Sequence, residues 1–168
     1  MKRKIVVGVF AALVLLLSGL AAPAEDWPVE FLKGALGNLK ELSILVEDVD
    51  PIGKKLGLTE KGLADEILVQ LRAKLPRLKI VVGKPLIEFL YLHVNIDERP
   101  AGGHYGIVLL HMKRVVMVVA TAETRSASVW HEGTIFIGPP GDGPRHVREI
   151  ISELVTKFAA DYYRAGNP

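Results

Sequence analysis

Hydrophobic and polar positions recur along this chain with two different periods, and these periods predict most of its secondary structure. Apolar residues return every three or four positions over residues 59–75 and again over residues 144–162, which is typical of amphipathic helices. Apolar and β-branched runs over Leu42–Glu47, Leu78–Val82 and Leu86–Ile96 predict strands instead. The chain therefore combines both kinds of element.

The strand pattern continues in the second half of the chain, over His104–Ala120 and Ser126–Ile137. The loop Glu98–Gly103 is short enough for a hairpin, so the strands on both sides of it and the one that follows should form a meander. A weaker helical pattern over Trp27–Leu39 is interrupted by Gly34 and Gly37. The predicted fold is α+β in the order (α)βαββββα, a largely antiparallel sheet of about five strands with helices packed on one face.

The first residues have the three parts of a secretory signal peptide. Lys2, Arg3 and Lys4 precede the apolar run Ile5–Leu17, and Ala22-Pro23-Ala24 supplies the small residues that a signal peptidase recognises. We expect residues 1–24 to be a signal peptide and residues 25–168 to be a single domain that is periplasmic or secreted after cleavage near Ala24. The alternative is an uncleaved membrane anchor.

The cysteine content and the net charge exclude further classes of protein. The chain has no cysteine, which excludes disulfides and a lipidated cysteine. The net charge of +2 depends on the leader, because three of the 21 basic residues and none of the 19 acidic residues lie there. A nearly neutral mature domain gives no reason to expect nucleic-acid binding.

Four of the five histidines fall between positions 93 and 131, and this clustering raises the hypothesis of a metal site. His93 shares a strand face with Phe89 and Tyr91, whereas His104 and His111 should point to opposite faces of the next strand. No metal-binding spacing such as HxH or HExxH is present. The sequence predicts no metal and no cofactor.

Hydrolytic chemistry finds equally little support. His131 and Glu132 are adjacent on a strand, so they should face opposite ways. Ser126 and Ser128 are expected on the same face as a core Trp130, without a GxSxG turn to expose either hydroxyl.

The start of the last helix is the most physical candidate for a ligand site. Glycines, an arginine and a histidine gather where free backbone N–H groups and the helix dipole favour anions. The candidate ligand-binding residues are Arg145, His146, Gly141 and Gly143. Pro144 removes one N–H donor and no P-loop motif is present, so a plain strand-to-helix connection is the alternative.

Several short segments resemble those of a group of small, uncharacterised exported bacterial proteins. They are VEDVD at residues 46–50, Gly57-Leu58-Thr59, Leu71-Arg72, Leu92-His93-Val94-Asn95-Ile96, Trp130, Phe158-Ala159-Ala160-Asp161-Tyr162-Tyr163 and Asn167-Pro168. The resemblance implies an envelope location and one α+β domain, and it brings no known activity or site residues.

The leading hypothesis is a non-enzymatic interaction or ligand-binding module of the bacterial envelope. The alternative is a small hydrolase or metal-dependent enzyme that uses His93, His104 or His131. If both faces of the strand at residues 104–120 are apolar, the uncovered face should bind an envelope protein or a second copy of the chain.

Overall fold

The computed structural model describes residues 27–84, 87–100 and 102–168. The predicted signal peptide at residues 1–24 lies outside them. The elements are α2 (Val29–Leu36), β1 (Glu41–Val46), α3 (Pro51–Lys55), α4 (Glu60–Lys74), β2 (Lys79–Val82), β3 (Glu88–Glu98), β4 (His104–Val118), β5 (Glu123–Gly138) and α5 (Gly143–Arg164). In the described part of the chain, no helix has the length and apolar character needed to cross a membrane.

The five strands form one mixed sheet in the order β2-β1-β3-β4-β5. β1 is parallel to both β2 and β3, while the β3-β4-β5 meander is antiparallel, as the sequence predicts. The antiparallel strands are also the longest, so the fold is α+β with a mostly antiparallel sheet. The parallel part arises because helices α3 and α4 connect β1 to β2.

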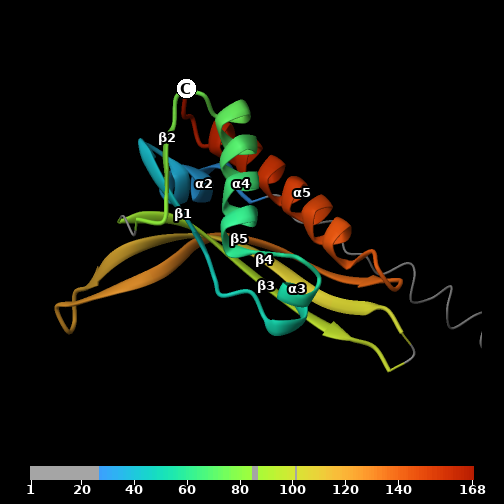
Figure 1. Ribbon diagram of the computed structural model, residues 1–168. Coiled ribbons are helices and arrows are strands. Elements are labelled where there is room, and N and C mark those ends of the chain that lie inside the picture. The colour runs from blue at the N-terminus through green and yellow to red at the C-terminus, as the bar shows by residue number, and fades with distance from the viewer. Residues whose placement is uncertain (1–26, 85–86, 101) are drawn as a thin grey trace, which may run out of the picture.

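Figure 1 shows α2, α4 and α5 together on one side of the sheet, with α5 running in nearly the same direction as β3 and β4. α5 contacts α2, α4, β4 and β5, and α4 contacts β1 and β2. The apolar stripe of α5 is buried, from Val147 through Ile151 and Phe158 to Tyr162. One hydrophobic core therefore lies between these helices and the sheet.

Trp130 of β5 is a fully buried core residue, and it is held by a buried carboxylate. Its Nε1 donates to Oδ2 of Asp161 at 3.0 Å, and its ring meets Phe158 edge to face at 5.2 Å. Oδ1 of Asp161 accepts from Arg164 at 2.9 Å. The two acceptor oxygens of one side chain thus connect β5 to the last two turns of α5.

A short helix, α3, follows β1, in a segment for which the sequence pattern predicts no element. Asp50 caps it by accepting from the Gly53 N–H at 2.8 Å, and Pro51 occupies the first turn. Lys54 forms an ion pair with Glu60 at 3.2 Å, and Lys55 forms one with Glu98 at 3.1 Å. Both lysines are therefore paired with carboxylates and form no basic patch.

The first turn of α4 contains an unusually acidic carboxyl group. Thr59 caps this helix by accepting from the Gly62 N–H at 3.0 Å. The carboxylate of Glu60 accepts from the Val49 N–H at 2.9 Å and pairs with Lys54. These contacts, the backbone hydrogen bond first, lower the pKa of Glu60 to about 2.

This pKa predicts a loss of stability in acid. A carboxyl whose pKa is lowered on folding stabilises the folded state above its unfolded pKa of 4.5, and that contribution disappears as the pH falls towards 2. Glu60→Gln should therefore lower the urea midpoint at pH 7, and the difference from the wild type should shrink near pH 2. A difference of the same size at both pH values would contradict this assignment.

The β4–β5 hairpin extends beyond the helices as an arm (Figure 1). The register shifts where Met112 pairs with Trp130 and Lys113 pairs with Ser128, which leaves Val129 as an extra residue in β5. The arm continues to Val118 and Glu123, so the polar stretch around Arg125 is strand and not loop. Met117 and Val119 near its tip are largely exposed.

Candidate functional site

The alternation of side chains gives the sheet two faces of very different burial. In residues 90–96 of β3 and 104–112 of β4, the even-numbered residues, such as Leu92 and Leu110, are buried, while the odd-numbered residues between them are half-buried or exposed. We call this second face the open face. It comprises Phe89, Tyr91, His93, Asn95, Asp97, Tyr105, Ile107, Leu109, His111, Lys113, His131, Ile135 and Ile137.

One half of the open face is apolar on β4 and β5, where it lies beside Asn95 and Asp97 of β3. Tyr105 pairs with Ile137 and Ile107 pairs with Ile135 across β4 and β5, and Leu109 follows on β4. Tyr105, Ile137 and Ile135 are 44%, 66% and 76% exposed. Contiguous exposed aliphatic and aromatic side chains on a flat sheet are typical of a surface that another molecule covers.

The other half of the open face is polar and begins at Glu47, just after β1. The Glu47 carboxylate pairs with Nδ1 of His93 and accepts from the Tyr91 hydroxyl. The hydrogen bond from His93 is the main cause that lowers the pKa of Glu47. Burial, followed by the hydrogen bond to Glu47, raises the pKa of Tyr91 to about 12. The Lys113 ammonium lies 3.9 Å from the Tyr91 ring centroid.

Two further imidazoles extend this polar half across β4 and β5. The rings of His111 and His131 stack with centroids 5.9 Å apart, and His131 also contacts the Trp27 ring. Nδ1 of His111 lies 3.2 Å from Oγ of Ser128. Burial, followed by the charge of Lys113, lowers the pKa of His111.

The structure separates the three histidines on which the hydrolase or metal hypothesis depends. His93 and His131 lie on the open face with β4 between them, whereas His104 is 7% exposed on the opposite face. Within residues 27–84, 87–100 and 102–168, no three histidines, cysteines or carboxylates are close enough to hold a metal ion. His93, His104 and His131 therefore form no shared site.

The serines of β5 lie on the face opposite to the predicted one. The sequence reasoning placed Ser126 and Ser128 on the face of Trp130, but the extra residue Val129 inverts the alternation between them. Ser128 consequently reaches His111 on the open face. His131 and Glu132 do face opposite ways, and Glu132 pairs with Lys157 of α5 at 2.8 Å.

The four candidate ligand-binding residues lie close together at the start of α5. The two that have functional side chains, Arg145 and His146, already contact other residues. The Arg145 guanidinium pairs with Asp142 at 2.9 Å and with Glu149 at 2.8 Å, so the pKa of Arg145 is raised. The His146 ring stacks on Phe136 with centroids 6.4 Å apart.

The two glycines of this turn have different surroundings. Gly141 has a φ of 85°, while Gly143 is buried against the rings and side chains of His104 and Leu56. Nδ1 of His104 and of His146 are buried and have no hydrogen-bond partner among the described residues. Anion binding by Arg145, His146, Gly141 and Gly143 stays a prediction.

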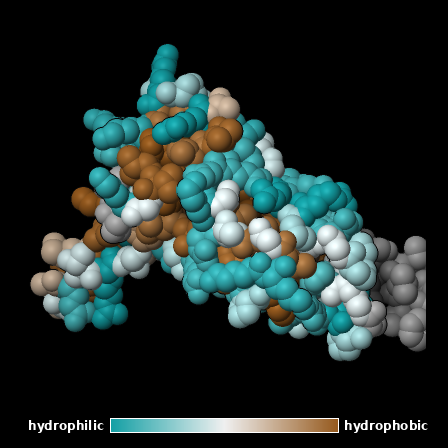
Figure 2. Space-filling model, in the orientation of Figure 1, coloured by the Kyte–Doolittle hydropathy of each residue, from teal (hydrophilic) through white to brown (hydrophobic). Residues whose placement is uncertain are grey.

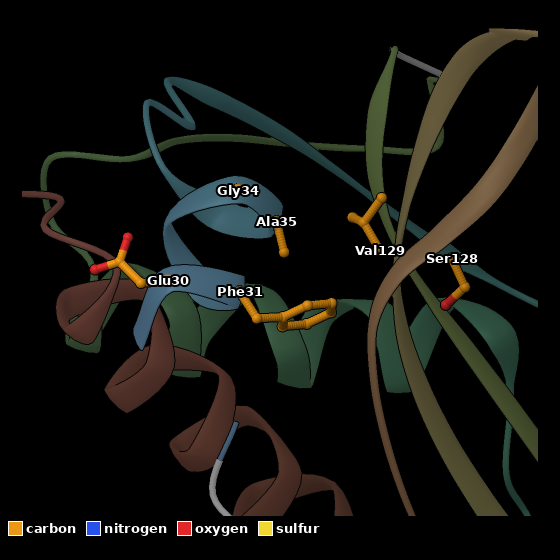
Figure 3. A pocket seen from close by; sticks show the side chains of 6 residues that line it. All are labelled: Glu30, Phe31, Gly34, Ala35, Ser128 and Val129. Carbon is orange, nitrogen blue, oxygen red and sulfur yellow. The ribbon is translucent and has the colours of Figure 1, made fainter. Parts of the chain in front are cut away.

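A groove of about 400 Å³ lies between α2 and β5. Figure 3 shows the Phe31 ring and the Ala35 side chain directed towards β5, where Ser128 and Val129 form the facing wall. Glu30 points away from this space and Gly34 leaves it free of a side chain. Sequence reasoning missed the groove because it treated Gly34 only as a residue that weakens the helix.

A second groove, of about 240 Å³, lies between α4 and the β1–β2 edge of the sheet. Ile44, Val46, Ala64 and Val82 contribute apolar side chains to it. Figure 2 shows hydrophobic surface gathered in this region, between β2 and α4. The charged residues that line this groove are Glu60 and Lys61, and both already have ion-pair partners. The groove therefore offers no unpaired charge to a ligand.

Comparison with known proteins finds similarity at the level of structure alone. No family model and no curated protein matches the sequence. A variant of the PelC dodecamer from Paraburkholderia phytofirmans matches with a TM-score of 0.41 and 14% identity, over 74% of this chain and 86% of that one.

Two further solved structures are similarly distant. An uncharacterised protein matches with a TM-score of 0.37 and 13% identity, over 76% of this chain and 92% of its own. A minor lipoprotein from Acinetobacter baumannii matches with a TM-score of 0.31 and 10% identity, over 76% of this chain and 94% of its own. The chain thus resembles uncharacterised proteins and lipoproteins, and none of these likenesses assigns it an activity.

Proposed function

We propose that this chain is an exported, non-enzymatic module that docks onto another protein through the open face of its sheet. In this proposal residues 1–24 are a signal peptide removed near Ala24, and the mature domain is in the periplasm or is secreted. The basic, apolar and small-residue segments of the leader support the export step.

The observation that carries the docking proposal is the cluster of Tyr105, Ile107, Leu109, Ile135 and Ile137. Apolar side chains on one face of these strands already form the core beneath the helices, so the cluster on the other face is not needed for it. Ile135 and Ile137 are 76% and 66% exposed, and contact of so much apolar surface with water is unfavourable unless a partner covers it.

The polar half of the open face supports specificity in the same binding event. Glu47, His93 and Tyr91 hold one another in a hydrogen-bonded group, so they present fixed donors and acceptors beside the apolar half. Polar groups arranged around an apolar centre are the usual composition of a protein interface.

Site-specific photocrosslinking in cells that express the full chain tests the proposal. A photoreactive amino acid at Tyr105, Ile135 or Ile137 should give one adduct of the same mass from all three positions. An adduct with twice the mass of the chain would identify a second copy as the partner, and any other defined mass an envelope protein.

Val69 of α4 provides the matched control. It is 68% exposed, close to the value for Ile135, but it lies on a helix surface away from the sheet. The same probe at Val69 should give no such adduct, and Ile107→Asp should remove the adduct from Ile135. Equal crosslinking from Val69, or persistence of the adduct in Ile107→Asp, would overturn the proposal.

A further inference from the structure

The groove between α2 and β5 contains a glycine that the packing of the chain does not explain. A Cβ added at Gly34 would meet no atom within 4 Å, although Gly34 lies inside a helix, where glycine is destabilising. By contrast, a Cβ at Gly37 would lie 2.3 Å from the Lys33 carbonyl oxygen, and one at Gly62 would lie 2.9 Å from Oγ1 of Thr59. Gly34 keeps open a space that a side chain could fill.

The walls of this space are held in place by contacts outside it. The Trp27 ring stacks on Phe31 with centroids 4.6 Å apart, and Arg164 donates to the Trp27 carbonyl oxygen at 3.0 Å. Arg114 of β4 also donates to the Gly34 carbonyl oxygen at 3.4 Å, so α2 is tied to the sheet. The groove is therefore formed before any ligand arrives, which lowers the entropic cost of binding.

The side chains that line the groove offer hydrocarbon contacts, and none of their polar groups is free. Phe31, Ala35 and Val129 contribute apolar side chains. The Ser128 hydroxyl is engaged with His111 and with the Trp130 carbonyl oxygen, while the Glu30 carboxylate pairs with Lys33 at 3.0 Å and points away (Figure 3). A polar group placed here would lose its hydration without a partner, so the part of a ligand inside must be hydrocarbon.

The size and opening of the groove limit the ligand further. A volume of about 400 Å³ lies in the range of small-molecule sites, and Phe31 remains 42% exposed at its mouth. A molecule that fits has an apolar chain inside and a polar end in water. We propose that the α2–β5 groove binds the alkyl chain of a free single-chain amphiphile of the fatty-acid class.

Titration of the ¹⁵N-labelled mature chain with monomeric dodecanoate, followed by amide chemical shifts, tests this. We expect saturable shifts concentrated at Phe31, Gly34, Ala35, Ser128 and Val129. Gly34→Leu should abolish these shifts, because its side chain fills the groove, and it should keep or raise the melting temperature. Val69→Leu, a matched enlargement on the outer surface of α4, should bind dodecanoate like the wild type.

Several outcomes would overturn the proposal. These are unchanged binding by Gly34→Leu, shifts that do not saturate, and shifts centred on Ile107, Ile135 and Ile137 of the open face. Membrane lipids are the other source of alkyl chains, and sedimentation with phosphatidylcholine vesicles tests for them. Binding to vesicles without binding to dodecanoate would show that the groove contacts a membrane surface and not a free amphiphile. Crosslinking from Ile135 should be unchanged in Gly34→Leu, so this test and the test of the open face fail independently.

Discussion

Asp161→Ala is expected to lower the free energy of unfolding by about 3 kcal/mol, because a buried carboxylate with two partners is removed. Asp161 is 2% exposed, and its oxygens accept from Trp130 at 3.0 Å and from Arg164 at 2.9 Å. The alanine variant leaves the indole N–H buried beside an apolar methyl group. Urea unfolding followed by far-UV circular dichroism measures the loss.

Asp161→Asn separates the two contacts. The amide oxygen can still accept from Nε1 of Trp130, whereas the charge opposite Arg164 is lost. Its expected effect is about half that of alanine, since charge-assisted and neutral hydrogen bonds share the stabilisation. Equal stability of the alanine variant and the wild type would show that this buried contact does not hold β5 to α5.

Gly106→Ala is expected to destabilise the protein by about 2 kcal/mol through overpacking in the sheet. A Cβ at Gly106 would lie 2.3 Å from the carbonyl oxygen of Asn95 and 2.8 Å from the Phe136 ring. The first atom belongs to the backbone of β3, so β3 and β4 would have to move apart. Melting temperature and urea midpoint should both fall.

Gly34→Ala supplies the control with the opposite sign. Its added methyl group meets nothing within 4 Å, and alanine favours a helix over glycine by about 0.5–1 kcal/mol. Gly34→Ala should therefore be at least as stable as the wild type, while Gly106→Ala is less stable. If both variants changed in the same direction, local space around each glycine would not explain its presence.

The spacing of apolar residues predicts the antiparallel part of the fold, because that part pairs strands that follow one another directly along the chain. The helix of residues 60–74 and the meander of β3, β4 and β5 follow from apolar spacing and from a short loop before His104. The parallel pairing of β1 with β2 depends on a crossover through α3 and α4, and that of β1 with β3 joins strands that are not consecutive, so apolar spacing gives no signal for either. The Asp50-Pro51 pair could have predicted α3, since it supplies an N-cap and a first-turn proline.

The candidate site could be predicted only where a single strand determines it. Alternation along one strand correctly grouped His93 with Tyr91 and separated His104 from His111. The Glu47–His93 pair joins residues 46 positions apart, and the contact of Ser128 with His111 depends on the extra residue at Val129. Such contacts arise from pairing between strands, so the order of residues within either strand cannot reveal them.

Cysteine labelling tests the covered state of the open face most directly, and the absence of native cysteines makes single-cysteine variants free of background. Ile135→Cys and Val69→Cys would each be labelled with N-ethylmaleimide, once as dilute purified protein and once in intact cells. Docking through the open face predicts that Ile135→Cys reacts several-fold more slowly in cells, while Val69→Cys reacts equally in both settings. Equal rates for Ile135→Cys in cells and in solution would contradict the account.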